Sequence, residues 1–250
     1  MDKALKALLD WWEEAGVNVP DMPPAKPKPR ASQSIAPQTA ALQQAAPSAP
    51  PAAPSPAASA LAQSAKTLAE LKTAMEGFDA GALSDGATQC VFSRGNPESD
   101  IMVIGEAPGR DEDIQGKPFV GRSGQLLDKM FASIGLSEDD FYITNVINWR
   151  PPNNRNPKPE EIALCRPFLD RHIELMNPKV MVIVGGVSLT AMTGLTGIMK
   201  NRGQWQTLTI GGRDIPALPI YHPAFLLRQP AMKKHAWRDL LSLRARLSEL

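Results

Sequence analysis

The chain has 250 residues, a formal net charge of +1 and 43% hydrophobic residues, which is enough for one sizeable α/β domain and an additional segment. A net charge this small excludes a positive potential over the whole protein surface. Residues 201–250 nevertheless carry eight Lys/Arg against three Asp/Glu, a local excess of positive charge that would either contact phosphates or lie on a solvated helix. Two cysteines argue against a disulfide scaffold, and the sequence shows no signal peptide and no apolar run of the roughly 20 residues that a membrane span needs. We therefore expect a soluble cytoplasmic protein.

Two different segments precede the predicted folded domain. Residues 1–20 place Leu5, Leu8, Leu9 and Trp12 at helical spacing, which predicts an amphipathic helix that either docks on the domain or binds a protein partner. Residues 21–64 consist mainly of Ala, Pro, Ser and Gln, a composition that predicts a disordered linker. The folded domain is then expected over residues 65–250.

Four apolar runs in this domain predict buried strands, at residues 100–106, 141–146, 179–186 and 215–222. Helical patterns lie between and after them, at residues 123–136, 159–176, 188–195 and 233–250. Because strands and helices alternate, the sequence predicts an α/β fold of three layers, with a central four-stranded, mainly parallel sheet between helices.

Glycine-rich or polar residues follow every predicted strand. The first strand continues into "GEAPG" (105–109), the second ends at Asn145, the third at Gly185-Gly186 and the fourth at His222-Pro223. "GEAPG" is neither a dinucleotide fingerprint nor a phosphate loop, but its small residues allow backbone N–H groups to approach a ligand. Ligands of open α/β sheets bind outside the carboxyl ends of the strands, so we expect the functional site there.

Three longer runs carry a resemblance to a known family. They are "GEAPGRDEDIQGKPFVGRSGQLLD" (105–128), "YITNVINWRPPNNRNPKPEE" (142–161) and "YHPAFLLRQP" (221–230), and together they resemble the family-4 uracil-DNA glycosylases over residues 88–240. The resemblance implies a uracil-DNA glycosylase-like fold, a monomer, and uracil-containing DNA as partner. It also implies an enzyme that flips the base out of the helix and hydrolyses its N-glycosidic bond.

The resemblance assigns three residues to binding of the base. Phe119 matches the aromatic ring that stacks on uracil, Asn145 matches the amide that reads its edge, and Ala107 stands where family-1 enzymes have an Asp. A core phenylalanine and an asparagine bonded only to backbone are the structural alternatives. Family-1 enzymes also have a Tyr where this chain has Gly109, so we expect a roomier pocket that accepts other deaminated or 5-substituted bases.

Four residues are implied in catalysis. His222 matches the histidine that hydrogen-bonds the O2 of the base as negative charge builds up there. Asp111 or Asn154 is expected to place the water, with Glu106 orienting the site, although an exposed acidic turn is an alternative for Asp111.

The resemblance also implies contacts with the DNA strand. Leu226 or Leu227 is expected to act as a wedge in the base stack, and Arg228 as a phosphate contact. Packing at the start of a helix is the alternative for the two leucines.

The typical family-4 enzyme holds a 4Fe-4S cluster on four cysteines, and this chain departs from that pattern. Aligned on the family, Phe78, Gly81 and Trp149 take three ligand positions and only Cys165 remains. One thiolate does not hold such a cluster, so we expect no metal and no cofactor, with Trp149 and Phe78 filling its volume.

Three other functions compete with turnover glycosylase activity. A covalent or non-turnover uracil-DNA binding protein of the same superfamily would use a histidine in an inserted basic loop, which "RPPNNRNPKP" (150–159) lacks. A decayed interaction module would tend to have lost His222, and an unrelated nucleotide-binding protein would need a phosphate loop.

Overall fold

The computed structural model describes residues 55–250, which form a six-stranded sheet between two helical layers. The strand order is β1-β3-β2-β4-β6-β5. The strands are β1 (Arg94–Gly95), β2 (Ile101–Gly105), β3 (Tyr142–Asn145), β4 (Val180–Val184), β5 (Gln206–Ile210) and β6 (Arg213–Ile220). The four central strands run parallel, and β1 and β5 pair antiparallel at the two edges.

The alternation of side chains along the central strands divides the core between the two faces of the sheet. In β2, Met102 and Ile104 face one cluster, whereas Ile101 and Val103 face the other, and all four are at most 3% exposed. A strand that is covered on both faces reads as a continuous apolar run, which is why the sequence predicted these four strands.

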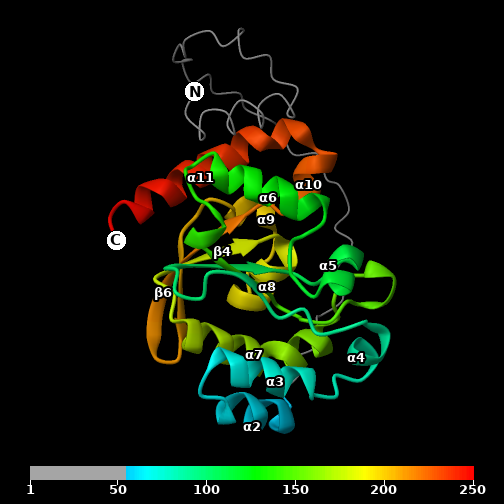
Figure 1. The fold of residues 1–250 in the computed structure, drawn as a ribbon. Coiled ribbons are helices and arrows are strands. Elements are labelled where there is room, and N and C mark those ends of the chain that lie inside the picture. Colours follow the sequence, from blue (N-terminus) through cyan, green and yellow to red (C-terminus); the bar gives the residue numbers. More distant parts are fainter. Residues whose placement is uncertain (1–54) are drawn as a thin grey trace, which may run out of the picture.

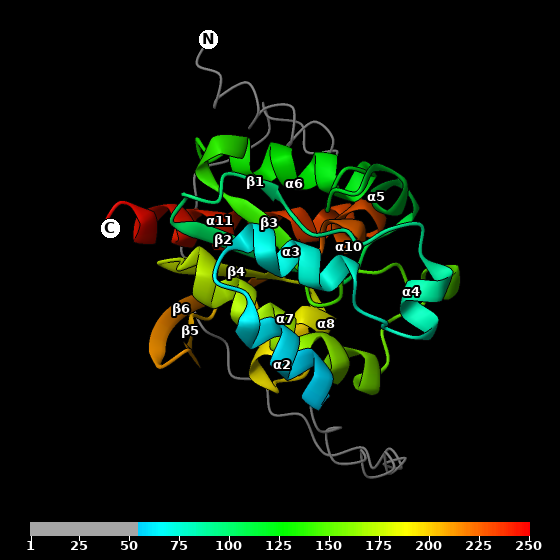
Figure 2. The same cartoon turned by 60° about the horizontal axis from the view of Figure 1, so that its bottom comes forward.

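The helical layers are shown in Figures 1 and 2. One layer holds α2 (Pro56–Ser64), α3 (Leu68–Glu76) and α7 (Pro159–Met176); the other holds α6 (Arg122–Ala132), α10 (Pro223–Arg228) and α11 (Lys233–Leu247). The shorter helical segments are α4 (Ala82–Gly86), α5 (Arg110–Gln115), η2 (Glu138–Asp140), η3 (Pro152–Asn154), α8 (Gly186–Thr193), α9 (Ile198–Asn201) and η4 (Pro230–Met232). The three-layer α/β/α architecture is therefore as predicted.

The predicted number of strands is wrong, because the sheet has six strands rather than four. The strand β5 was missed although it forms a hairpin with β6 across Gly211-Gly212, both of which have positive φ. Two consecutive glycines between two segments of alternating polar and apolar residues indicate a hairpin. The side chains of "QTLTI" (206–210) alternate in burial, as those of an edge strand do. The strand β1 has only two residues, too few for a periodic pattern.

The predicted linker ends too late. Residues 56–64 form α2, whose Ala58 and Ala62 are at most 1% exposed and pack in the core cluster that includes Phe168 and Leu169 of α7. Small side chains let this helix approach α7 closely, so an alanine-rich segment here is packed structure. The expectations for residues 1–20 and for the rest of the linker lie outside the described residues. In residues 55–250, no helix has both the length and the apolar character that crossing a membrane requires.

Candidate active site

The carboxyl ends of β2, β3, β4 and β6 bring the predicted site residues together. Gly105 ends β2 directly opposite Asn145 of β3. A Cβ on Gly105 would lie 2.3 Å from Asn145 Oδ1 and 2.4 Å from Phe119 Cε2. A Cβ on Gly185, whose φ is +97°, would lie 3.1 Å from the Cβ of His222. The glycines at these strand ends are thus required by the close packing of the site.

A cavity of about 1140 Å³ opens at this edge of the sheet. It exceeds the ~300–1,000 Å³ of typical small-ligand pockets, so it has room for a base and for neighbouring parts of a larger ligand. Six of the predicted site residues line it, namely Glu106, Ala107, Phe119, Asn154, His222 and Arg228. Further lining comes from residues 185–187 at the start of α8 and from Ile198 and Met199 of α9.

Phe119 is held in an unusual conformation beside His222. Its φ is 55°, in the left-handed region that is uncommon for a bulky residue. The two rings stack with 5.7 Å between their centroids and 30° between their planes. A strained aromatic residue at a cavity wall is typical of a functional position, since its conformation is imposed by the surroundings.

Glu112 holds the loop that carries Phe119. Its carboxylate accepts hydrogen bonds from the backbone N–H groups of Val120 at 3.0 Å, Gly121 at 2.9 Å and Gly109 at 3.1 Å. One charged side chain therefore ties the turn after β2 to the aromatic wall. The sequence analysis missed this residue, although a Glu three positions after Gly109 has capping-box spacing.

Asn145 is the most unusual polar group of the site. Its side chain is 2% exposed, and neither Nδ2 nor Oδ1 has a hydrogen-bond partner in the described part of the chain. The alternative of an asparagine satisfied by backbone is therefore wrong. Leaving a buried amide unpaired costs roughly 1–3 kcal/mol, which marks both atoms as candidates for binding a ligand.

His222 is a neutral hydrogen-bond donor. Its Nδ1 accepts the backbone N–H of Ala224 at 3.1 Å, which leaves the proton on Nε2. Burial, reinforced by the charge of Arg228, lowers the pKa of His222 to about 4. The imidazole consequently donates from Nε2 without carrying a charge at neutral pH.

The three residues considered for placing water occupy different environments. Glu106 is half-buried in the cavity wall, and burial raises the pKa of its carboxyl. Asp111 is exposed on α5 and is not part of the lining; a Cβ on Gly121 would lie 3.0 Å from its Oδ2. Asn154 lies at the rim, where its Oδ1 accepts from Arg150 Nε at 2.6 Å. Of the two predicted acids, only Glu106 lines the cavity with Ala107. Glu112 also lines it, but its carboxylate holds the Phe119 loop.

The two predicted wedge leucines differ in exposure. Leu226 is 0% exposed and belongs to the core, so the expectation that it contacts DNA is wrong for this conformation. Leu227 is 36% exposed at the end of α10, next to Arg228. The sequence alone does not show which of the two leucines is exposed, because adjacent positions in a short helix differ only in the direction of their side chains.

Phe78 and Trp149, which were expected to fill the volume of an iron-sulfur cluster, belong to one aromatic group with Phe168. The ring of Phe78 lies 6.4 Å from that of Trp149 and 5.0 Å from that of Phe168, and Trp149 is 4% exposed. Burial raises the pKa of Cys165 to about 12, and that of Cys90 also to about 12, so both thiols stay protonated. These residues do not fit a cluster that needs four thiolates. Within residues 55–250, no three His, Cys, Asp or Glu side chains gather as a metal site.

Comparison with known proteins gives consistent matches. A model of the uracil DNA glycosylase superfamily matches residues 92–241. The type-4 uracil-DNA glycosylase of Archaeoglobus fulgidus is 43% identical over 157 residues, which are 61% of this chain and 79% of that protein. That of Saccharolobus solfataricus is 42% identical over 164 residues, 63% and 76% of the two chains. A type-5 uracil-DNA glycosylase from Thermus thermophilus is 31% identical over 122 residues, 43% and 55% of the two chains.

Proposed function

Because the chain belongs to the uracil DNA glycosylase superfamily, we propose that it removes uracil from DNA by hydrolysing the N-glycosidic bond and leaves an abasic site. Type-4 uracil-DNA glycosylases at 43% and 42% identity support this activity. The observation that carries the proposal is the buried, unpaired amide of Asn145 beside Phe119 and His222. A hydrogen-bonding edge next to an aromatic face is what recognition of a flipped base requires.

Asn145 and Phe119 bind the base in this proposal. Uracil offers an N3–H donor beside an O4 acceptor, so Asn145 Oδ1 accepts from N3 while Nδ2 donates to O4. Cytosine offers the opposite pattern at these two atoms and leaves the amide mismatched. The Phe119 ring packs on the face of the base, and Ala107 leaves space beside it.

His222 stabilises the departing uracil. As the bond between N1 and C1′ breaks, its electron pair moves onto the base and charge accumulates on O2, while the sugar gains oxocarbenium character. The neutral Nε2–H donates to O2, and a preorganised donor of this kind is commonly worth about 3–4 kcal/mol. A neutral donor pays no cost for burying its own charge.

Glu106 places the attacking water. Two acids line the cavity, Glu106 and Glu112, and the Glu112 carboxylate is already bonded to three backbone N–H groups. Asp111 is exposed outside the lining, and Asn154 is bonded to Arg150. The raised pKa of Glu106 makes its ionised form a stronger hydrogen-bond acceptor for water. The water oxygen bonds to C1′ and its proton passes to the carboxylate, so Glu106 replaces Asp111 and Asn154 in this role.

Leu227 and Arg228 contact the DNA strand. Leu227, which is 36% exposed and adjoins the cavity-lining Arg228, fills the gap that the flipped base leaves. Arg228 lines the cavity mouth and meets a phosphate.

Gly109 widens the range of bases. A Cβ at this position would lie 2.7 Å from the Glu112 carboxylate. Glycine therefore lets Glu112 hold the loop and leaves space in the pocket for a larger base. We expect uracils with a substituent at carbon 5 to be excised. Excision of uracil without detectable excision of any modified base would contradict this.

The aromatic group of Phe78, Trp149 and Phe168 stands in place of the cluster that the typical family-4 enzyme holds. The chain contains two cysteines, and buried aromatic packing supplies stability there without a metal. We place it in a branch that has lost three of the four ligands. A brown preparation that absorbs in the visible range would contradict this.

The activity is tested with a labelled single-stranded oligonucleotide that contains one uracil. Alkali-dependent cleavage is expected, with a loss of about 10²–10³ in rate for His222→Ala. His235→Ala is the matched control, because His235 lies on α11 and does not line the cavity. A retarded band without cleavage, seen before alkali treatment, would instead indicate a non-turnover or covalent binding protein.

A further inference from the structure

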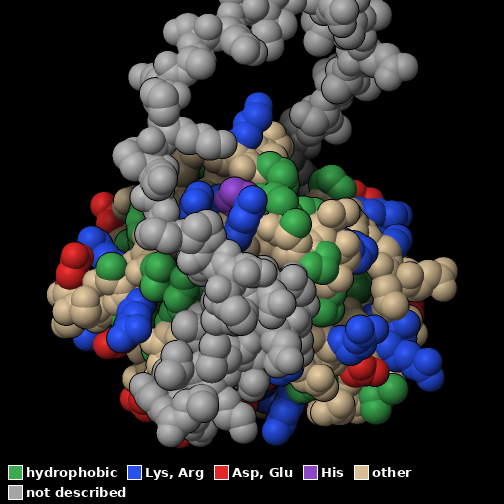
Figure 3. All heavy atoms as spheres, turned by 90° about the horizontal axis from the view of Figure 1, so that it is seen from above, with side chains coloured by type: hydrophobic (Ala, Val, Ile, Leu, Met, Phe, Trp, Pro, Cys, Tyr) green, Lys and Arg blue, Asp and Glu red, His purple; other side chains and the backbone are tan. Residues whose placement is uncertain are grey.

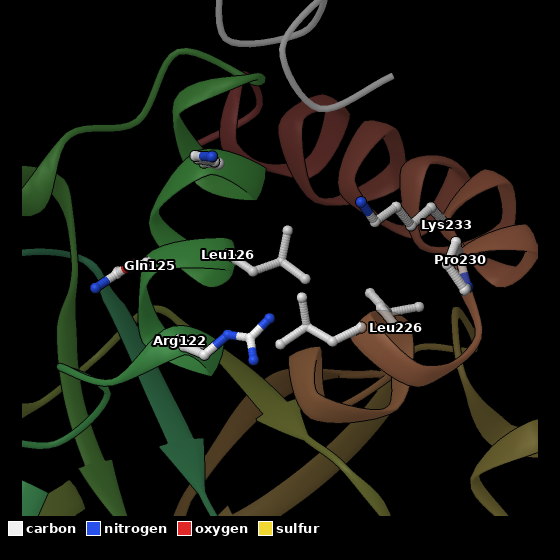
Figure 4. Close-up of a pocket in the computed structure, with 8 residues that line it drawn as sticks. Arg122, Gln125, Leu126, Leu226, Pro230 and Lys233 are labelled. Atoms are coloured by element: carbon white, nitrogen blue, oxygen red, sulfur yellow. The ribbon is translucent and has the colours of Figure 1, made fainter. Parts of the chain in front are cut away.

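A second cavity, of about 310 Å³, lies between α6, α10 and the start of α11. Figure 4 shows Arg122 and Lys233 pointing into it from opposite sides, with Leu126 and Leu226 between them and Gln125 turned away. The remaining lining residues are Lys129, Leu227 and Pro230. Among the described residues, its lining therefore combines three cationic side chains with leucines and includes no acid.

The helix α11, which borders the cavity through Lys233, also carries an apolar stripe formed by Trp237 and Leu241. Lys233, Trp237 and Leu241 follow one another at spacings of four residues, so they lie along one side of this helix. Trp237 is half-buried against the core cluster, and Leu241 is 42% exposed. On the neighbouring helix α6, Arg122, Leu126 and Lys129 share a face by the same helical spacing.

We propose that the groove formed by this cavity and the Trp237–Leu241 stripe binds residues 2–16 of the same chain. These residues lie outside the described part of the chain, and their sequence has the pattern that such a groove would bind. Leu5, Leu8, Leu9 and Trp12 recur at helical spacing, and "DWWEE" (10–14) carries three acids and no base. An apolar stripe flanked by acids complements the Trp237–Leu241 stripe, which lies beside the cationic side chains of the cavity, and this is the helix-in-groove mode of recognition.

Chain connectivity favours this occupant. Residues 17–54 join the segment to the domain, and a chain of that length spans on the order of 35 Å if it behaves as a flexible coil. Tethering of this kind gives effective concentrations in the mM range, so even an intrinsic Kd of about 0.1 mM keeps most molecules docked.

A DNA phosphate is the other anion that this surface could attract. Figure 3 shows the same face, with Lys and Arg side chains next to a histidine. A phosphodiester would use Arg122 and Lys129, but it would gain nothing from Leu126, Trp237 or Leu241. The apolar half of the groove therefore favours the amphipathic segment.

Docking has a consequence for DNA binding. Leu227 lines this cavity, and the next residue, Arg228, lines the active-site cavity. A docked acidic segment thus borders the surface where the DNA strand arrives and offsets its positive charge. Releasing the segment should strengthen binding of DNA at low salt.

The test uses the full chain and a carbodiimide, which links carboxylates to amines in contact. In the monomer we expect links from Glu13 or Glu14 to Lys129 or Lys233. Leu8→Asp places a charge in the apolar stripe, so it should reduce the yield of these links by roughly tenfold. Leu42→Asp, in the predicted linker, is the matched control and should leave it unchanged.

Hydrogen exchange gives an independent readout on the domain itself. Residues 122–132 and 233–247 should exchange faster in Leu8→Asp than in wild type, with Leu42→Asp resembling wild type. Links that appear only in a dimer would show docking on a second copy and overturn the proposal. The proposal would also be overturned if no links formed, or if their yield did not change in Leu8→Asp. Protection of both helices only after an oligonucleotide is added would overturn it as well, and would show that the groove binds DNA.

Discussion

One methyl group at Gly105 should disable the active site. The Cβ of Gly105→Ala would lie 2.3 Å from Asn145 Oδ1, 2.4 Å from Phe119 Cε2 and 2.8 Å from Phe119 Cζ. Ordinary contacts of a Cβ begin near 3.4 Å, so the side chains that bind the base must together yield by roughly 1 Å. Displacements of about 1 Å cost on the order of 10²-fold in rate. Overpacking a buried strand also costs about 1–3 kcal/mol of stability.

The assay is single-turnover excision of uracil, measured beside urea-induced unfolding. Gly77→Ala is the matched control, because its added Cβ meets only Thr73 O, at 3.6 Å. We expect Gly105→Ala to stay folded and to lose about 10²-fold in rate, with Gly77→Ala unchanged. A folded Gly105→Ala variant that excises uracil at the wild-type rate would refute the placement of the base between Asn145 and Phe119.

Three further predictions concern pH, positioning and packing. Burial lowers the pKa of His172 to about 3 and that of His222 to about 4, so the unfolded state binds protons that the folded state does not. The contribution of these histidines to the free energy of unfolding should be fully present above about pH 6.5 and should decrease by about 3 kcal/mol per histidine by pH 4. A free energy of unfolding in urea that does not change over this pH range would contradict the prediction. Glu112→Gln should weaken the hold on the Phe119 loop and raise KM more than it lowers kcat, and unchanged steady-state kinetics would remove Glu112 from this role. Trp149→Ala should lower the unfolding free energy by about 3–5 kcal/mol, and a loss below 1 kcal/mol would show that Trp149 is not core packing.

The central strands and the site at their carboxyl ends could be predicted from the sequence, because strands buried on both faces are continuous apolar runs. The helix at residues 159–176 has the predicted bounds, since it opens with a proline and two glutamates. The strand β5 and the helix α2 could not be read this way, since an edge strand is only half apolar and an alanine-rich helix resembles a linker.

Within the candidate site, it could be predicted which residues lie close together, whereas the directions of their side chains could not. Asn145, Phe119 and His222 converge as expected, whereas the burial of Leu226 and the exposure of Asp111 depend on how α10 and α5 are rotated. The role of Glu112 depends on the backbone N–H groups of Gly109 and of the adjacent Val120 and Gly121, which only the folded chain brings together.

The account rests on the reading of a uracil edge by the Asn145 amide. The most direct test compares the release of free uracil and free cytosine from two oligonucleotides that differ only in that base. Wild type should release uracil and no cytosine, and Asn145→Leu, which keeps the bulk without the polar atoms, should lose at least about 10²-fold on uracil. Equal release of uracil by wild type and a folded Asn145→Leu variant would contradict the account.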